Sequence, residues 1–183
     1  MKLVQATNKT EIAMITAMLQ KKYPAIYADI WKVGVNLSLR ISDLLAIKFS
    51  DLDISNRELK LIEQKTSKAK TIRLNSTALE VITARLKQYP TDIYLFQVHS
   101  NRANDKPISR ISVSRVFKEV GDMLGLEINT HSMRKSRGKA MFDDGVPVAM
   151  IAKVLNHSSE AATLRYLGIT HNQVLQTYDD YEL

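Results

Sequence analysis

Apolar residues recur at every third or fourth position through most of the chain, a spacing that places them on one face of an α-helix. The first apolar stripe consists of Ile12, Ile15 and Leu19. Asn8 and Glu11 precede this stripe in the pattern of a capping box, and Pro24 ends it. A second stripe through residues 25–37 predicts a second helix, whose apolar face we expect in the core.

The period shortens to alternation after residue 57, where "ELKLIEQ" and "KTIRLN" are typical of two short strands. The intervening "KTSKA" predicts a β-hairpin with a lysine-rich turn. Before the hairpin, Ser42 is a candidate N-cap for a short helix that carries Leu44, Leu45 and Ile47.

Helical periodicity returns beyond the hairpin. Ser76 or Thr77 is expected to cap a helix that runs to about Gln88, and residues 97–107 are expected to form a loop. The further predicted helices run from Ser109 to near Gly125, from about Thr130 to Gly145, from Pro147 onward, and around Tyr166. The sequence therefore predicts a mainly α fold with a small antiparallel β-sheet, as one domain over residues 1–170 with a C-terminal tail at 171–183.

With 45% hydrophobic and 25% charged residues, the chain has the composition of an ordinary globular domain. Its formal net charge of +7 favours a polyanionic partner, although a solvated lysine-rich surface would give the same charge. The absence of cysteine excludes disulfides and cysteine-ligated metals. Neither a signal-peptide pattern nor an apolar run of about 18 residues is present, so the sequence predicts a cytoplasmic protein.

Six side chains form the candidate chemistry. In chain order they are Arg40, Lys65, His131, Arg134, His157 and Tyr166. Each has an ordinary structural explanation, such as a surface arginine, a solvated turn lysine or an amphipathic core tyrosine. None of them indicates catalysis alone, and the information lies in their order and spacing.

The segments around these side chains resemble the catalytic domain of the tyrosine recombinases, the phage integrase family. They are "SLRISDL", "EQKTSKAK", "HSMR" and "LNHSS" with the following "TLRYLGI", and the resemblance extends from about residue 8 to residue 170. It implies that the catalytic residues are Arg40, Lys65, His131, Arg134, His157 and Tyr166. It also implies an activity, the cleavage and rejoining of DNA strands through a 3′-phosphotyrosyl intermediate.

The chemistry explains why these residue types are needed. A tyrosine hydroxyl with a pKa of about 10 is a poor nucleophile at neutral pH unless neighbours take its proton and neutralise the phosphate. Arg40 and Arg134 can offer forked donors to the nonbridging oxygens, while His131 and His157 can donate or accept a proton. The resemblance implies that Lys65 protonates the departing 5′ oxygen. Because the protein–DNA ester conserves the bond energy, neither a nucleotide cofactor nor a metal is expected.

The resemblance further implies double-stranded DNA as the partner and a homotetramer on that DNA. The tail at residues 171–183 would dock on a neighbouring subunit or pack on its own domain. The side chains expected to contact DNA phosphates, each equally explained by a solvated basic face, are Lys68, Lys70, Arg73, Lys135, Arg137 and Lys139. The core-binding domain usual in the family is not in this sequence, so we expect weak and strongly salt-dependent DNA binding.

Two glycines of the family pattern are replaced here, by Ser38 and Asn156. Asn tolerates a left-handed backbone, whereas Ser38 is expected to adopt a negative φ or to be strained. Asp43 matches an acidic position of the family, and we expect it to orient an arginine rather than to bind a metal.

Two alternative functions use the same residues. A type IB topoisomerase would need nearly the same side chains, although the "HxxR" and "LxHSS" patterns favour a recombinase. A catalytically inert DNA-binding regulator would keep the fold, but it has no need for a tyrosine hydroxyl. Tyr178 and Tyr181 are rival nucleophiles by residue type, yet neither has the nine-residue spacing from His157 that Tyr166 has.

Overall fold

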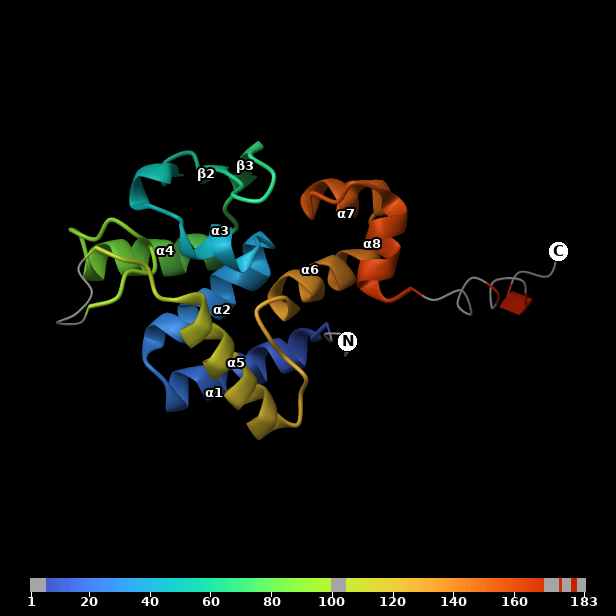
Figure 1. Ribbon diagram of the computed structural model, residues 1–183, viewed down its shortest axis with the longest axis horizontal. Coiled ribbons are helices and arrows are strands. Elements are labelled where there is room, and N and C mark those ends of the chain that lie inside the picture. The colour runs from blue at the N-terminus through green and yellow to red at the C-terminus, as the bar shows by residue number, and fades with distance from the viewer. Residues whose placement is uncertain (1–5, 100–104, 170–174, 176–178, 181–183) are drawn as a thin grey trace.

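A computed structural model describes residues 6–99, 105–169, 175 and 179–180 of the chain (Figure 1). It is mainly helical with one small antiparallel sheet, as the sequence predicts. In Figure 1 the helices α1 to α5 and the sheet form one body, while α7 and α8 lie together beside it and α6 joins the two.

The first two helices form where the apolar stripes predict them. Helix α1 (Lys9–Lys22) begins with a complete capping box, in which the Asn8 side chain accepts from Glu11 N–H at 2.9 Å and Glu11 accepts from Asn8 N–H at 2.8 Å. Helix α2 (Ala25–Leu37) buries Trp31, whose ring meets Phe117 edge to face with centroids 5.3 Å apart. Burial of this aromatic pair places α2 at the centre of the fold.

Helix α3 (Ile41–Leu45) begins one residue earlier than its predicted N-cap, Ser42. Arg40 occupies the N-cap position instead, with an extended backbone and no side-chain capping bond. The cause lies upstream, since Ser38 ends α2 in a left-handed conformation and turns the chain directly into α3. A short 3₁₀ helix, η1 (Phe49–Asp51), follows.

The predicted hairpin is present as β2 (Glu58–Ile62) and β3 (Ala69–Arg73), paired so that Leu59 lies opposite Ile72. A third strand, β1 (Leu52–Asp53), adds to the other edge of β2. Its two residues are too few to give a periodic signal, so the sequence analysis did not predict it.

The remaining helices match their predicted positions with small shifts. Helix α4 (Ser76–Gln88) is capped by Asn75 rather than by Ser76 or Thr77, because the Asn75 side chain accepts from Ala78 N–H at 3.0 Å. Helix α5 (Arg110–Leu124) has the predicted Ser109 cap and ends at Gly125 in the left-handed region. The next three helices along the chain are α6 (Ser132–Asp143), α7 (Val148–Val154) and α8 (Glu160–Leu167).

Two separate apolar clusters hold these elements. The large core is built from α1 to α5, the sheet and the connecting segments, and it also includes Met133 of α6. The small core consists of Ile151, Leu155 and Leu167, with partly buried Met141, Phe142, Val146, Tyr166 and Ile169 around them. Glycines allow α6 to pack closely against α2 on one side and against the small core on the other. A Cβ at Gly34 of α2 would lie 2.2 Å from Met133 Sδ, and one at Gly138 would lie 3.1 Å from Leu155 and Leu167.

Most of the predicted C-terminal tail at residues 171–183 lies outside the described residues. Within the described ranges, no helix has the length and apolar character needed to cross a membrane. The same ranges hold no group of three or more His, Asp or Glu side chains arranged to bind a metal ion.

Candidate active site

Arg134 is the buried centre of the site. It projects from the first turn of α6 with only 3% of its surface exposed, and its Nη1 donates to the carbonyl oxygen of Ser38 at 2.8 Å. Ser38 Oγ in turn donates to the Arg134 carbonyl oxygen at 3.4 Å. Of the two conformations expected for Ser38, a negative φ or a strained backbone, the structure shows the second. The backbone is left-handed, with φ 58°, and the contacts with Arg134 hold this fully buried residue in place.

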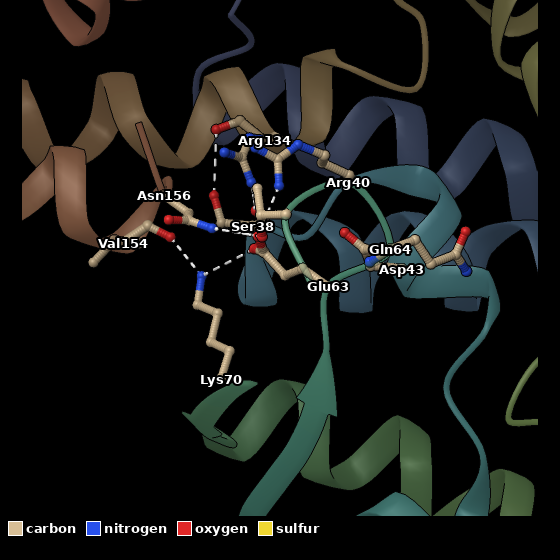
Figure 2. Close-up of polar contacts among 10 residues, drawn as sticks. Ser38, Arg40, Asp43, Glu63, Gln64, Lys70, Arg134, Val154 and Asn156 are labelled. Atoms are coloured by element: carbon tan, nitrogen blue, oxygen red, sulfur yellow. Dashed lines mark hydrogen bonds and ion pairs between the residues drawn. The ribbon is translucent and has the colours of Figure 1, made fainter. Parts of the chain in front are cut away.

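The two arginines lie side by side, as Figure 2 shows, so the residues 94 positions apart in the sequence meet in space. Burial, with the positive charge of Arg40, lowers the pKa of Arg134, although a guanidinium stays protonated at neutral pH. Arg134 Nη2 is buried and finds no hydrogen-bond partner in the described part of the chain. Nη2 is therefore a charged donor whose hydrogen-bonding capacity no described residue takes up.

Tyr166 lies on α8 beside this pair. Its ring meets the His157 ring edge to face at 5.0 Å, and its hydroxyl donates a long hydrogen bond of 3.5 Å to the carbonyl oxygen of His131. Burial raises the pKa of Tyr166 by more than the positive charges of Arg134 and Arg40 lower it. The phenol is therefore protonated at neutral pH in the free protein.

Both predicted histidines face the same charges. Burial, together with Arg134 and Arg40, lowers the pKa of His157 below its ordinary value. Burial, followed by Arg134, Arg110 and Arg40, does the same to the pKa of His131, the N-cap residue of α6. Both imidazoles are thus neutral at pH 7 and available as proton acceptors.

Thr163 is a site residue that sequence reasoning missed. Its fully buried hydroxyl lies 3.0 Å from His157 Nδ1 and also donates to the Ser159 carbonyl oxygen at 3.3 Å. A threonine within a helix gives no distinctive sequence signal, because its role depends on the histidine six residues earlier folding back onto α8.

Glu63 is the second residue that sequence reasoning missed, and it lies at the middle of Figure 2. Its carboxylate is fully buried and accepts from Arg40 Nη1 at 2.9 Å. The sequence did contain a signal for Glu63. Leu59 and Leu61 turn inward from β2, and Glu63, two residues further on, continues this every-second-residue pattern just past the end of the strand. A charged residue at an inward position of a strand is expected to have a specific partner.

Asp43 differs from its expected role. Its buried carboxylate accepts from the backbone N–H of Gln64 at 2.9 Å, so it contacts the hairpin, and it forms no hydrogen bond or ion pair with a described arginine. The carboxylate that contacts Arg40 belongs to Glu63, which directly follows β2, and not to the helix that Arg40 caps. Spacing alone favoured Asp43, because sequence proximity to Arg40 cannot reveal which strand residue folds against it.

The hairpin lysines separate into two environments. Lys65 lies exposed in the turn between β2 and β3, with no hydrogen bond or ion pair to the described part of the chain. Lys70, expected to contact DNA, instead donates to the carbonyl oxygen of Val154 at 2.7 Å and lies 4.0 Å from Glu63 (Figure 2). Burial lowers the pKa of Lys70. The structure thus gives Lys70 partners inside the protein and leaves Lys65 on the surface.

The other residues expected to contact DNA also divide. Lys68 and Arg73 are exposed, and Lys139 pairs with Asp143 on the surface of α6. Lys135 is buried and Arg137 is partly buried, and burial lowers the pKa of both. The surface position that the prediction assumed for Lys135 is therefore not observed, because the α6 face that carries it packs inward.

Comparisons with known proteins show the family to which the chain belongs. The profile of the Phage integrase family matches residues 5–173. The chain is 35% identical over 147 residues to the probable integrase/recombinase YoeC of Bacillus subtilis, covering 79% of this chain and 78% of YoeC. It is 31% identical over 133 residues to the tyrosine recombinase XerA of Pyrococcus furiosus, covering 72% of this chain but only 46% of XerA.

Solved structures share the fold at low sequence identity. The crystal structure of XerA recombinase superposes with a TM-score of 0.74 at 17% identity, over 97% of this chain and 64% of that chain. The Tn1549 transposon integrase in complex with a circular intermediate DNA gives 0.75 at 17% identity, over 99% of this chain and 67% of that chain. The chain therefore has the fold of a recombinase catalytic domain and spans about half to two thirds of the length of several relatives. Since the family profile covers most of its length, the chain belongs to the phage integrase family of tyrosine recombinases.

Proposed function

We propose that this protein cleaves and rejoins DNA strands at specific sites through a 3′-phosphotyrosyl intermediate on Tyr166. One observation carries the proposal. Two guanidiniums and two imidazoles, contributed by segments far apart in the sequence, lie around a single phenol. A protein that only bound DNA would need the positive charges but not a phenol hydroxyl beside them.

The arginines would hold the phosphate under attack. Arg134 Nη2 is a buried cationic donor without a partner among the described residues, so a nonbridging phosphate oxygen would satisfy it. Arg40 lies beside it with its side chain 20% exposed. Preorganised donors of this kind stabilise the charge that develops on phosphorus in the transition state.

Proton transfer would fall to the histidines and the hairpin lysine. Because the pKa of Tyr166 is raised and those of His131 and His157 are lowered, the free protein holds a protonated nucleophile beside two neutral bases. Lys65 would protonate the departing 5′ oxygen after the DNA contacts the hairpin, a role that rests on the family pattern.

The decisive experiment uses a nicked suicide substrate, which traps the covalent adduct. We expect the wild-type chain to form a protein–DNA adduct, and Tyr166→Phe to form none. The matched controls are Tyr178→Phe and Tyr181→Phe, which should keep the adduct. Persistence of the adduct in Tyr166→Phe would reassign the nucleophile, and its absence from the wild type would remove the proposal.

The site-specific outcome is separated from topoisomerase activity with a supercoiled plasmid that lacks recombination sites. A recombinase should leave most of that plasmid supercoiled. Efficient relaxation would favour a type IB topoisomerase, and binding without either reaction would favour an inert regulator.

We also propose that the protein works on double-stranded DNA as a homotetramer, which would locate it with the nucleoid in the cytoplasm. The tail at residues 171–183 would then contact a neighbouring subunit. The test is deletion of residues 170–183, after which strand exchange between two sites should fail while adduct formation persists. Intact strand exchange would show that the tail does not connect subunits.

A further inference from the structure

Glu63 contacts several charged and polar side chains, although the proposed function gives it no role. Its buried carboxylate accepts from Arg40 at 2.9 Å, from Thr66 Oγ1 at 2.8 Å and from the side-chain amide of Asn156, with Lys70 at 4.0 Å. These five side chains are called the Glu63 network (Figure 2). Burial alone would raise the pKa of Glu63, but the hydrogen bonds from Asn156 and Thr66 and the charge of Arg40 hold that pKa below its ordinary value.

The partners come from three separate parts of the fold. Arg40 is the N-cap of α3, Thr66 belongs to the hairpin turn next to Lys65, and Asn156 directly precedes His157. A single carboxylate therefore connects the first arginine, the turn that carries the lysine, and the segment that carries a histidine. Lys70 adds a second link of the same kind, because it reaches from β3 to the carbonyl oxygen of Val154 at 2.7 Å.

The side chain of Asn156 is not needed for the local backbone. Its φ of 47° is left-handed, a conformation that glycine adopts most readily, and glycine is the residue of the family pattern at this position. What the asparagine adds is an amide, which donates to Glu63 and lies 3.3 Å from Thr66 Oγ1. A glycine at this position could not make these contacts with Glu63 and Thr66.

The network also balances charge. Arg40, Arg134 and Lys70 lie close enough that each guanidinium affects the pKa of Lys70. The carboxylate of Glu63 is the negative charge in direct contact with Arg40 among the described residues. A fixed anion beneath the guanidinium restricts its orientation, because a charge-assisted hydrogen bond is directional.

We propose that Glu63 is a positioning residue for DNA cleavage, which orients Arg40 and, through Asn156, holds the turn with Lys65 against the segment that leads to His157. Glu63 acts through these residues and does not itself contact DNA. The inference rests on the proposed function, since Arg40, Lys65 and His157 have their roles only if the chain cleaves DNA.

The test compares Glu63→Gln with Glu58→Gln. Glu58 is the first residue of β2, the strand that ends just before Glu63. Among the described residues its side chain pairs with Lys60 at 3.5 Å on the surface, and Glu58→Gln gives the same change in net charge. For each variant, the single-turnover cleavage rate and the dissociation constant for DNA are measured separately. We expect Glu63→Gln to cleave about 10- to 100-fold more slowly than Glu58→Gln, because reacting groups are misplaced. DNA affinity should be equal to or higher than that of the control.

That separation distinguishes positioning from a merely structural role, which would weaken binding and cleavage together. Asn156→Gly provides a second variant that keeps the left-handed backbone and removes only the amide. We expect Asn156→Gly to slow cleavage severalfold. The Ser67 amide closes the hairpin turn by donating to the Glu63 carbonyl oxygen at 2.8 Å, and its hydrogen should exchange about tenfold faster, the effect of losing one hydrogen bond to a charged group. If Glu63→Gln does not fold, Asn156→Gly alone decides.

Cleavage by both variants at the rate of Glu58→Gln would overturn the inference, as would a parallel loss of binding and cleavage. Failure of the wild type to form any adduct would instead overturn the proposed function. In that case amide exchange still tests whether Glu63 and Asn156 hold the hairpin turn in place. Unchanged exchange at Ser67 in both variants would refute that role.

Discussion

The large core and the small core contribute unequally to one active site. The large core buries aromatic anchors such as Trp31, Phe96 and Phe117, whereas the small core has only Ile151, Leu155 and Leu167 fully or nearly buried. The segment that carries Arg40 packs in the large core, whereas the segments that carry His157 and Tyr166 pack in the small core. Arg134 comes from α6, which packs on both.

This difference shows how Tyr166, the proposed nucleophile, is held in place. Local opening is easiest where little apolar surface is buried, so α7 and α8 are expected to open before the large core does. Polar contacts join the small core to the rest, among them Lys70 with Val154, Asn156 with Glu63, and Tyr166 with His131. The position of Tyr166 therefore depends on contacts that a few substitutions can remove.

Arg134→Lys should produce the largest effect, because it changes the residue at the junction of both cores. Lysine keeps the positive charge but loses the forked geometry that donates to Ser38 and leaves a second nitrogen free. We expect single-turnover cleavage to fall about 10²- to 10³-fold. The exposed Arg165→Lys on α8 is the control and should cleave normally. Cleavage within threefold of the wild type would mean that charge alone suffices.

Leu155→Ala should destabilise the small core selectively. Leu155 is fully buried there, and its truncation should cost about 2–5 kcal/mol of opening free energy. Amide hydrogen exchange should quicken in α7 and α8 while α2 stays protected. The matched Leu44→Ala, fully buried in the large core, should quicken exchange throughout the chain. Equal loss of protection in α2 and α8 for Leu155→Ala would mean that the cores unfold as one unit.

Lowering the pH should produce the next largest effect, a loss of folding stability. Because the pKa values of His131 and His157 are lowered in the folded protein, the unfolded chain binds more protons as the pH falls below about 6.5. The free energy of unfolding should therefore decrease from pH 6.5 to 5.5, by well under the limit of about 1.4 kcal/mol per pH unit for each histidine, because His131 is exposed and His157 only partly buried. Urea titrations of the wild type and of His131→Gln/His157→Gln measure this slope. An equally steep slope in the double variant would assign it to other groups.

Ser38→Gly should have the smallest effect. Glycine relieves the left-handed backbone of Ser38 but loses the 3.4 Å contact from its hydroxyl to Arg134. We expect a gain of at most about 1 kcal/mol in the free energy of unfolding, with cleavage unchanged. A loss of more than that amount, measured by urea titration, would show that the serine hydroxyl holds Arg134 in place.

Local patterns in the sequence predicted most of the fold. The capping box at Asn8, the stop at Gly125 and the alternation around the hairpin are each decided by neighbours in the chain, so they were predictable. The exceptions are also local in cause. Strand β1 is too short for a period, and the left-handed Ser38 moved the N-cap of α3 from Ser42 to Arg40.

The candidate site was predictable as a set of residues but not as a set of contacts. Residue types and their order identified Arg40, Arg134, His131, His157 and Tyr166. The sequence also determined where the helices begin and end, because caps and apolar periods act over a few residues. Only the tertiary structure decided that Glu63 rather than Asp43 contacts Arg40, that Lys70 turns inward while Lys65 stays exposed, and that Thr163 meets His157. Those contacts depend on how α6 joins the two cores, and a charged side chain takes the partner that the fold brings within hydrogen-bonding distance, whatever its separation along the chain.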